Sequence, residues 1–438
     1  MPRETVTGYC WPQSVEPGGR VALHLSSSGG RRAAVEVARI GRDRTVVLSD
    51  PAVEAGEHAT PVDAFSNGCG WPEALGIDVD PSWRSGYYEV TFEIDVAGRP
   101  RRDHAFFVVR PQIGASSAPR LLVLSTNTWH AYNDFGGRNL YTGATTVSLQ
   151  RPMSPGYLFK PPGAGRRVTT TSPPDPQMAT HIGYLQLNHL SPYAGSAGWP
   201  DWELPFVEWA EREGYAFDVA TNADLEDHPE LLSDHDGAGY RMVLSVGHDE
   251  YWTREMFANV RRARDAGVGL AFLSGNSVYH RIDLRPGGGR PHRVFGRVDQ
   301  FADERDLMGA TSYGVGMGDW VCRKPGHWLF AGTGMREGDR IPQLVGWEYH
   351  GYPTREGGDL VVVATGETKQ TEDPPYAATV YTAAKGNVVF NAATCWWNMV
   401  LSTPPGFMNP PNRNFTENDP RVQRITSNLL KRMISGKP

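Results

Sequence analysis

The sequence predicts a two-domain protein: an all-β sandwich over residues 1–112, then an α/β domain with a mostly parallel sheet over residues 113–438. Three observations lead to this fold class. The chain has 438 residues, which is more than one hydrophobic core usually serves. Up to about residue 112, apolar residues alternate at a period of two, as in antiparallel strands. Beyond residue 119, continuous apolar runs alternate with helical patterns, which indicates β-α-β units.

The first domain is expected to contain strands only. Turn sequences such as Pro17-Gly18-Gly19 separate segments that alternate apolar and polar residues. The predicted strands are 20–25, 34–40, 88–94 and 104–110. Short alternating strands with such turns predict an immunoglobulin-like sandwich. The stretch from Pro111 to Pro119 then predicts a linker.

The second domain begins with a continuous apolar strand at 120–125. An amphipathic pattern over 203–214, closed by Gly214, predicts a helix. Three more buried strands are expected at 216–221, 241–246 and 268–273, with a helix at 254–266 between the last two. The segments 359–364, 378–382 and 387–391 predict an extension of the sheet before a C-terminal helix at 420–433.

Composition excludes several classes of protein. Hydrophobic residues make up 39% of the chain and charged residues 21%, which indicates a globular interior and argues against disorder. The net charge of −6 argues against a nucleic-acid or anionic-membrane partner. No apolar run approaches about 18 residues, and the N-terminus lacks the pattern of a signal peptide. We therefore expect a soluble, cytoplasmic protein.

The four cysteines, Cys10, Cys69, Cys322 and Cys395, are widely spaced and form no zinc-site pattern. Structural zinc is therefore disfavoured, and we expect reduced, mostly buried thiols. If the protein were exported, Cys10 and Cys69 could form a disulfide.

Three predicted strands are followed by irregular turns rich in polar and aromatic residues. These segments are 125–141, 247–252 and 274–280. In an open parallel sheet, ligands bind beyond the carboxyl ends of the strands because several loops converge there. The candidate site is therefore sought in these three segments.

The second segment reads Gly247-His-Asp-Glu-Tyr-Trp and lies where an α/β hydrolase would place its nucleophile. The position holds no Ser or Cys, so an acyl-enzyme mechanism is disfavoured. His248 and Glu250, two residues apart, can supply a proton-transfer group and a metal ligand to one pocket. The simpler alternative is that Asp249 or Glu250 caps the following helix and His248 packs beneath it. The aromatic residues of segment 125–141 can likewise be explained by packing alone.

Four segments together resemble the catalytic C-terminal domain of the large subunit of N,N-dimethylformamidase. They are Thr126-Asn-Thr-Trp-His-Ala-Tyr-Asn, Gly136-Gly-Arg-Asn-Leu-Tyr, Glu203-Leu-Pro-Phe and Ser245-Val-Gly-His-Asp-Glu-Tyr-Trp. The similarity covers roughly residues 118–435. In that family, a mononuclear iron is held by two tyrosines and a glutamate, in a fold like that of class I glutamine amidotransferases. The resemblance implies the same fold and an iron cofactor here.

The resemblance also implies a ligand set. Glu250 corresponds to the carboxylate ligand, and Tyr132 matches the first tyrosine. For the second tyrosine we prefer Tyr141, which follows a Gly-Gly turn, over Tyr157 or Tyr184. Phenolate and carboxylate oxygens are hard donors suited to Fe(III), and three protein ligands leave positions open for water and substrate.

His248 corresponds to the catalytic acid/base of that family. A further catalytic glutamate corresponds to Glu348 in Val345-Gly-Trp-Glu-Tyr-His, although a salt-bridged glutamate at a strand end is an alternative for it. A glutamine-amidotransferase mechanism needs a cysteine as the nucleophile at the turn after the strand, where this chain has His248. No cysteine is near His248 in the sequence, and Cys395 is expected in the core.

We therefore predict an iron-dependent hydrolase of an amide- or formamide-type C–N bond in a small molecule. The inserted β-domain and small partner subunit of the formamidase have no counterpart in the sequence, so a substrate other than dimethylformamide is expected. Two alternatives stay open. One is a non-hydrolytic mononuclear iron enzyme of a biosynthetic pathway, which a dependence on O₂ would distinguish from the hydrolase, and the other is a carbohydrate- or ligand-binding protein without metal. A homo-oligomer is also left open, as is a lid or interface arm at 151–176.

Overall fold

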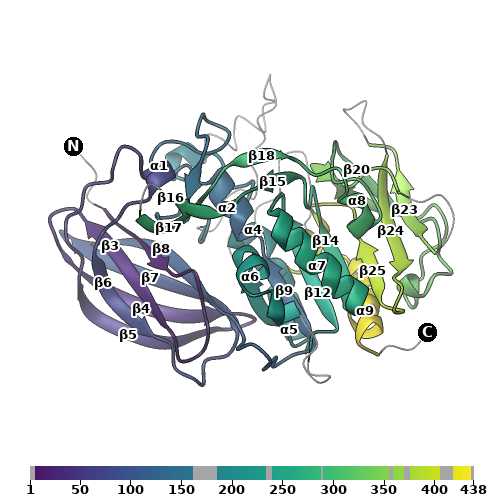
Figure 1. The fold of residues 1–438 in the computed structure, drawn as a ribbon, viewed down its shortest axis with the longest axis horizontal. Coiled ribbons are helices and arrows are strands. Elements are labelled where there is room, and N and C mark those ends of the chain that lie inside the picture. The colour runs from purple at the N-terminus through teal and green to yellow at the C-terminus, as the bar shows by residue number, and fades with distance from the viewer. Residues whose placement is uncertain are drawn as a thin grey trace.

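The computed structural model describes residues 5–160, 185–232, 239–287, 290–354, 359–368, 375–404 and 418–435. Figure 1 shows an N-terminal unit built mainly of strands, next to a larger unit whose central sheet is flanked by helices. The N-terminal unit also contains the short helix α1 (Ala64–Asn67), so the expectation of strands only is wrong. Of the stretch expected to be a lid or arm, only 151–160 is described; the remainder and Tyr184 lie outside the described residues. No helix in the described ranges is both long and apolar enough to cross a membrane.

The N-terminal unit is a sandwich of two sheets, with strand orders β1-β3-β6 and β2-β8-β7-β4-β5. The strands are β1 (Val6–Trp11), β2 (Ser14–Val15), β3 (Arg20–Ser27), β4 (Arg32–Ile40), β5 (Arg44–Glu54), β6 (Glu73–Asp78), β7 (Gly86–Val96) and β8 (Arg99–Val109), with helix α1 (Ala64–Asn67) before β6. Alternate side chains of both sheets, including Leu23, Val37 and Phe92, form one core between them.

The four strands predicted for this unit are present as β3, β4, β7 and β8. The sequence did not predict β5, which among the described strands pairs only with β4, at the edge of its sheet, and is exposed along most of its length. An edge strand with little burial has no reason to alternate apolar and polar residues, so its pattern is weak.

The second unit is built on a seven-stranded sheet with the order β11-β9-β12-β14-β25-β24-β23. Its strands are β9 (Arg120–Leu124), β11 (Asp218–Thr221), β12 (Met242–His248), β14 (Gly269–Gly275), β23 (Val361–Gly366), β24 (Tyr376–Thr382) and β25 (Val388–Asn391). The first five strands in the order are parallel, and β24 and β23 are antiparallel to their neighbours. The mostly parallel sheet and its predicted C-terminal extension are therefore confirmed.

Helices cover both faces of this sheet. They are α5 (Leu204–Arg212) and α9 (Pro420–Ser435) on one face, and α6 (Asn222–Asp227) and α7 (Arg254–Ala266) on the other. Strand residues alternate between the two cores: Leu244 packs in the core that contains Ile425 of α9, and its neighbour Val243 in the core that contains Val260 of α7. Both faces of each central strand are thus buried, which explains the continuous apolar runs in the sequence.

Short elements lie around the central sheet. They are α2 (Thr126–Tyr132), α4 (Trp199–Trp202), α8 (Arg305–Met308), η1 (Pro229–Leu232), η2 (Trp328–Phe330), η3 (Trp397–Val400), β10 (Val147–Ser148), β13 (Tyr251–Trp252), β15 (His280–Ile282), β16 (Arg285–Gly287), β17 (Arg290–Phe295), β18 (Arg297–Gln300), β19 (Gly314–Val315), β20 (Gly318–Val321), β21 (Arg340–Val345) and β22 (Glu348–Tyr349). In Figure 1, β15 and β18 lie above β12 and β14.

Helix α2 corrects one prediction, because the sequence suggested an irregular segment at 125–141. All seven residues of α2 are buried. Thr, Asn, His and aromatic residues have low helix propensity, so tertiary packing determines this helix. The ring centroid of Trp129 lies 5.1 Å from that of Phe106 in the sandwich. The side-chain nitrogen of Gln13, also in the sandwich, lies 2.8 Å from Nε2 of His130.

The sandwich and the α/β unit share further contacts beside α2. The ring of Tyr87 stacks on Trp199 of α4, with centroids 4.0 Å apart and planes 6° from parallel. Arg39 on β4 forms a 2.5 Å ion pair with Glu211 of α5. These contacts fix the outer face of the five-stranded sheet against the α/β unit.

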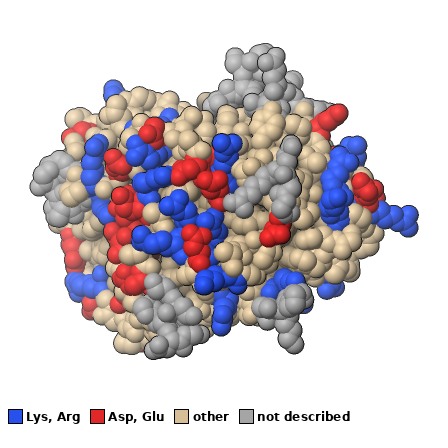
Figure 2. Space-filling view, turned by 45° about the vertical axis from the view of Figure 1, so that its right-hand side comes forward, with Lys and Arg blue, Asp and Glu red and all other residues tan. Residues whose placement is uncertain are grey.

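The surface in Figure 2 mixes basic and acidic side chains over one part of the face and is largely uncharged over the neighbouring part. No broad area of a single sign is visible on this face. The four cysteines are buried as expected, and Cys10 and Cys69 form no disulfide.

Candidate metal centre

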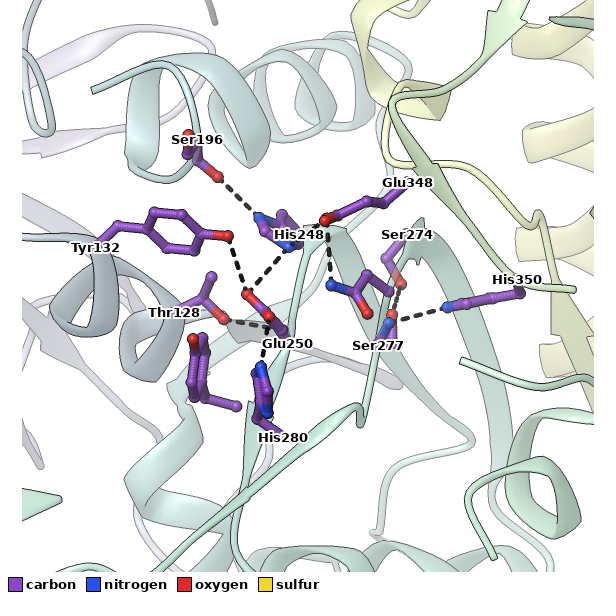
Figure 3. A network of polar contacts seen from close by, with 12 residues as sticks. Thr128, Tyr132, Ser196, His248, Glu250, Ser274, Ser277, His280, Glu348 and His350 are labelled. Carbon is purple, nitrogen blue, oxygen red and sulfur yellow. Dashed lines mark hydrogen bonds and ion pairs between the residues drawn. The ribbon is translucent and has the colours of Figure 1, made fainter. Parts of the chain in front are cut away.

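The candidate site lies beyond the carboxyl ends of three neighbouring parallel strands (Figure 3). Tyr132 belongs to α2, which follows β9; His248 ends β12, and Glu250 follows it closely. Asn276 comes directly after β14. Because β9, β12 and β14 are adjacent and parallel, their carboxyl ends deliver these side chains to one place.

Gly247 bends the chain immediately before the site. Its φ is 82°, and a Cβ atom added here would lie 2.7 Å from Cβ of Trp202. A side chain would therefore meet both an unfavourable backbone conformation and a steric clash, which glycine avoids. His248, the last residue of β12, lies beside Trp202, whose ring centroid is 6.1 Å from that of the imidazole.

Asp249 points away from this pocket. Its carboxylate accepts hydrogen bonds from Oγ of Ser245 at 2.9 Å and from Nδ2 of Asn222 at 3.1 Å. Helix α7 is capped by Thr253, whose side chain accepts a hydrogen bond from a backbone N–H of the first turn. The simpler hypothesis that Asp249 or Glu250 caps this helix is therefore wrong.

Three oxygen-bearing side chains converge in the pocket. The hydroxyl of Tyr132 donates to Oε2 of Glu250 at 3.1 Å, and the hydroxyl of Tyr141 lies 2.9 Å from the same atom. The two hydroxyl oxygens are 2.7 Å apart, and the rings stack with centroids separated by 4.3 Å. Glu250 is only 3% exposed and Tyr132 6%, whereas 41% of Tyr141 is exposed although its hydroxyl points inward.

The surroundings disfavour negative charge on these three groups. Burial raises the pKa of Glu250 to about 7, with the charge of Glu348 adding to the rise and His248 opposing it. Burial, together with the charge of Glu250, raises the pKa of Tyr132 and Tyr141 well above the ordinary value of 10. A bound cation would be needed to hold all three groups as anions.

The chemistry and spacing of the three oxygens fit a small, highly charged metal ion. Phenolate and carboxylate are hard donors, and two phenolates with one carboxylate balance the charge of Fe(III). Metal–oxygen bonds of about 2.0 Å in an octahedron place neighbouring oxygens about 2.8 Å apart, close to the distances found here. In the described part of the chain, His, Cys, Asp and Glu alone nowhere form a group of three suited to a metal. The phenols are therefore essential to this candidate ligand set.

His248 is held in one tautomer beside this cluster. Its Nδ1 lies 2.8 Å from the carbonyl oxygen of Ser196, which can only accept, so Nδ1 carries a hydrogen. Nε2 then faces Oε2 of Glu348 at 3.1 Å and Oε2 of Glu250 at 3.5 Å. Burial alone would lower the pKa of His248, but the two carboxylates and the Ser196 carbonyl outweigh it and raise the pKa above 6.5.

Glu348 reaches the pocket from β22, far along the chain. Its Oε2 accepts a hydrogen bond from Nδ2 of Asn276 at 3.2 Å as well as facing His248. Asn276 has a φ of 51°, and its Oδ1 is buried without a hydrogen-bond partner among the described residues. A buried acceptor without a partner is costly, so this amide oxygen is available to a ligand.

His280 occupies the opposite side of Glu250. Its Nε2 lies 3.3 Å from Oε1 of Glu250, and its ring stacks on Tyr251 with centroids 5.1 Å apart. Burial, with the positive charges of Arg297 and His248, lowers the pKa of His280 to about 3. His280 is therefore neutral and adds no positive charge beside the carboxyl group.

All five predicted site residues thus lie in one cluster: Tyr132, Tyr141, His248, Glu250 and Glu348. Tyr157, the described alternative for the second tyrosine, is buried in the core against Gly198. The sequence prediction assigned no role to Asn276 or His280. The signal available for both was their position in segment 274–280, which follows a buried strand.

Comparison with known proteins finds one family and two curated relatives. A family model described as "N,N-dimethylformamidase beta subunit-like, C-terminal" matches residues 34–412. The N,N-dimethylformamidase beta subunit of Alcaligenes sp is 29% identical over 241 residues, and that of Paracoccus aminophilus is 27% identical over 241 residues. Each match covers 50% of this chain but only 29% of the relative's own length.

The bend at Gly247 leads to a stability prediction. Gly386 also has a positive φ, 85°, but a Cβ there would meet nothing within 4 Å. Gly386→Ala should therefore cost only backbone strain, about 1–2 kcal/mol. Gly247→Ala should cost about 1–3 kcal/mol more because of the contact with Trp202. Chemical unfolding of both variants measures the difference, and equal losses would contradict the clash.

The charge arrangement around His248 leads to a second prediction. Because the Glu348 carboxylate raises the pKa of His248, Glu348→Gln should lower it, so the imidazole should lose its proton at a lower pH. NMR titration of the histidine rings in metal-free protein measures this. Glu304→Gln is the control, since buried Glu304 contacts Ser312 instead. An unchanged or higher pKa of His248 in Glu348→Gln would show that the carboxylate is not the cause.

Proposed function

The chain belongs to the N,N-dimethylformamidase beta subunit-like family, and on this premise we propose that it is an iron-dependent hydrolase of an amide-type C–N bond in a small molecule. The observation that supports this most directly is the convergence of the Tyr132 and Tyr141 hydroxyls on the Glu250 carboxyl, next to His248. The matched part of the curated relatives is under one third of their length, so their activity is extended to this chain only as a proposal.

Tyr132, Tyr141 and Glu250 are the proposed ligands of a single ferric ion. When bound, such an ion supplies Lewis-acid polarisation of an amide carbonyl and lowers the pKa of a water molecule. The three side chains leave the side facing His248 and Glu348 free of further protein ligands in this proposal. Substrate and water are therefore expected to bind beside His248 and Glu348.

His248 is the proposed acid/base. Its Nδ1 hydrogen is committed to Ser196, so only Nε2 can accept a proton, and Nε2 is the atom that faces the pocket. His248 would take a proton from the attacking water and return it to the leaving amine. Glu348 would stabilise the protonated imidazole through its 3.1 Å contact, and Asn276 would hold Glu348 in place.

The finer features of the fold are also proposals. We propose that residues 1–112 form an immunoglobulin-like domain and residues 113–438 a class I glutamine-amidotransferase-like domain. The two face-to-face sheets support the first, and the strand-bend-helix at β12, Gly247 and α7 supports the second. In that arrangement, His248 stands where such folds place a nucleophile.

The assembly and location of the protein follow the same reasoning. The relatives are named as beta subunits, and we propose that this chain also forms an oligomer, which native mass spectrometry would measure.

Buried thiols at Cys10 and Cys69 without a disulfide are typical of a reducing compartment, which supports a cytoplasmic location.

Metal content tests the ligand set. Wild-type protein should carry about one iron per chain, and Glu250→Gln and Tyr141→Phe should lose most of it, because each removes one of three anionic donors. Tyr157→Phe is the matched control and should keep its iron. Mass spectrometry of purified variants measures this. Absence of metal from the wild type would remove the hydrolase mechanism and favour a ligand-binding role.

The acid/base assignment has its own test. His248→Ala should retain iron but hydrolyse formamides and other small amides about 10²- to 10⁴-fold more slowly, since one acid/base group typically contributes this factor. Wild-type turnover should be the same with and without O₂. Unchanged turnover in the variant would exclude His248 as the acid/base, and a requirement for O₂ would indicate a non-hydrolytic iron enzyme instead.

A further inference from the structure

Tyr251 lies directly behind the oxygen cluster. It is fully buried on β13, and its hydroxyl is 2.8 Å from the hydroxyl oxygen of Tyr141. Arg297 donates to the Tyr251 oxygen from Nε at 3.0 Å and also from a terminal guanidinium nitrogen. A guanidinium cannot accept a hydrogen bond. The single hydroxyl hydrogen of Tyr251 is therefore directed at Tyr141.

Arg297 also acts on Tyr141 through the face of its ring. The guanidinium carbon lies 4.4 Å from the centroid of the Tyr141 ring and 5.4 Å from that of Tyr251. In the described residues, no carboxylate lies within ion-pair distance of Arg297, whereas Arg281 on the neighbouring strand pairs with Asp299. The charge of Arg297 is thus directed at the two tyrosines.

We propose that Tyr251 and Arg297 are positioning residues that hold the Tyr141 oxygen in place as a metal ligand and limit how strongly it donates electrons to the metal. This inference rests on the proposed iron site. It adds two residues outside the ligand set, and a direct contact links each to the next: Arg297 to Tyr251, and Tyr251 to Tyr141.

The physical reason is electrostatic. A hydrogen bond to the Tyr141 oxygen and a cation over its ring both stabilise negative charge on the phenolate. Such a phenolate shares less of its charge with a bound metal, so the metal stays a stronger Lewis acid. Partners of this kind also orient the ligand, and their removal typically weakens metal binding about 10- to 100-fold.

The test uses the colour of an iron–phenolate bond together with metal affinity. Metal-free full-length protein is titrated with ferric citrate, and the visible absorption band from phenolate to iron is recorded for Tyr251→Phe, Arg297→Gln and wild type. Both variants should shift the band to longer wavelength, because a less stabilised phenolate loses its electron more easily. Both should bind ferric iron about 10- to 100-fold more weakly. Arg297→Lys should give a smaller shift, since it keeps the charge but not the two-nitrogen contact.

Matched controls separate this effect from general damage. Tyr240→Phe removes another buried hydroxyl, which donates to Asp218 at 2.9 Å, and Arg281→Gln removes a guanidinium from the same small sheet. Both should keep the wild-type band and affinity. Arg297 is exposed, so Arg297→Gln should not disturb folding. If Tyr251→Phe fails to fold, the band and affinity of Arg297→Gln alone test the positioning role.

The outcomes distinguish this inference from the proposed function. If wild-type protein binds iron with a phenolate band and both variants show the same band and affinity, the positioning role is overturned while the iron site stands. If the wild type shows neither iron nor a band, the iron site fails and this inference fails with it. A shifted band in both variants and unshifted controls support it.

Discussion

The buried carboxyl group of Glu250 is the constraint on which the rest of the site depends. A carboxyl group almost out of contact with water is costly unless hydrogen bonds or charges compensate it. Here Tyr132 and Tyr141 approach its oxygens from one side, and His248 and His280 from others. These partners come from the three segments 125–141, 247–252 and 274–280, so the fold must hold three separate parts of the chain in place.

The fold meets this constraint through the ends of its parallel strands and through the sandwich. Adjacent strands bring α2, the bend at Gly247 and the segment after β14 to one point. Helix α2, which positions Tyr132, has a sequence that does not favour a helix, and the sandwich packs on it through Phe106 and contacts it through Gln13. The N-terminal unit therefore contributes to the geometry of the site, although none of its side chains is a proposed ligand.

Charge is distributed unevenly around Glu250. Groups that can exchange a proton lie on one side, where His248 faces Glu348. A permanently positive group lies on the other, where Arg297 contacts Tyr251 and covers the ring of Tyr141. In the proposed chemistry, these two sides do different work: one moves protons, and the other stabilises an anionic ligand.

The sequence by itself determined the features that depend on local order along the chain. Alternation at a period of two predicted β3, β4, β7 and β8, and continuous apolar runs predicted the parallel strands. The run from Gly247 to Trp252 marked the candidate site because it follows a buried strand directly. A family resemblance then supplied the tyrosines and Glu348, which periodicity alone does not single out.

Only the tertiary structure decided which distant side chains meet. It formed α2 from a segment of low helix propensity and placed the unpatterned strand β5 at a sheet edge. It also joined Asn276 to Glu348, and Arg297 to Tyr251. The physical reason is that these contacts form between segments far apart in the chain. Their distances depend on how strands, loops and the sandwich pack together, and no local pattern in the sequence records that packing.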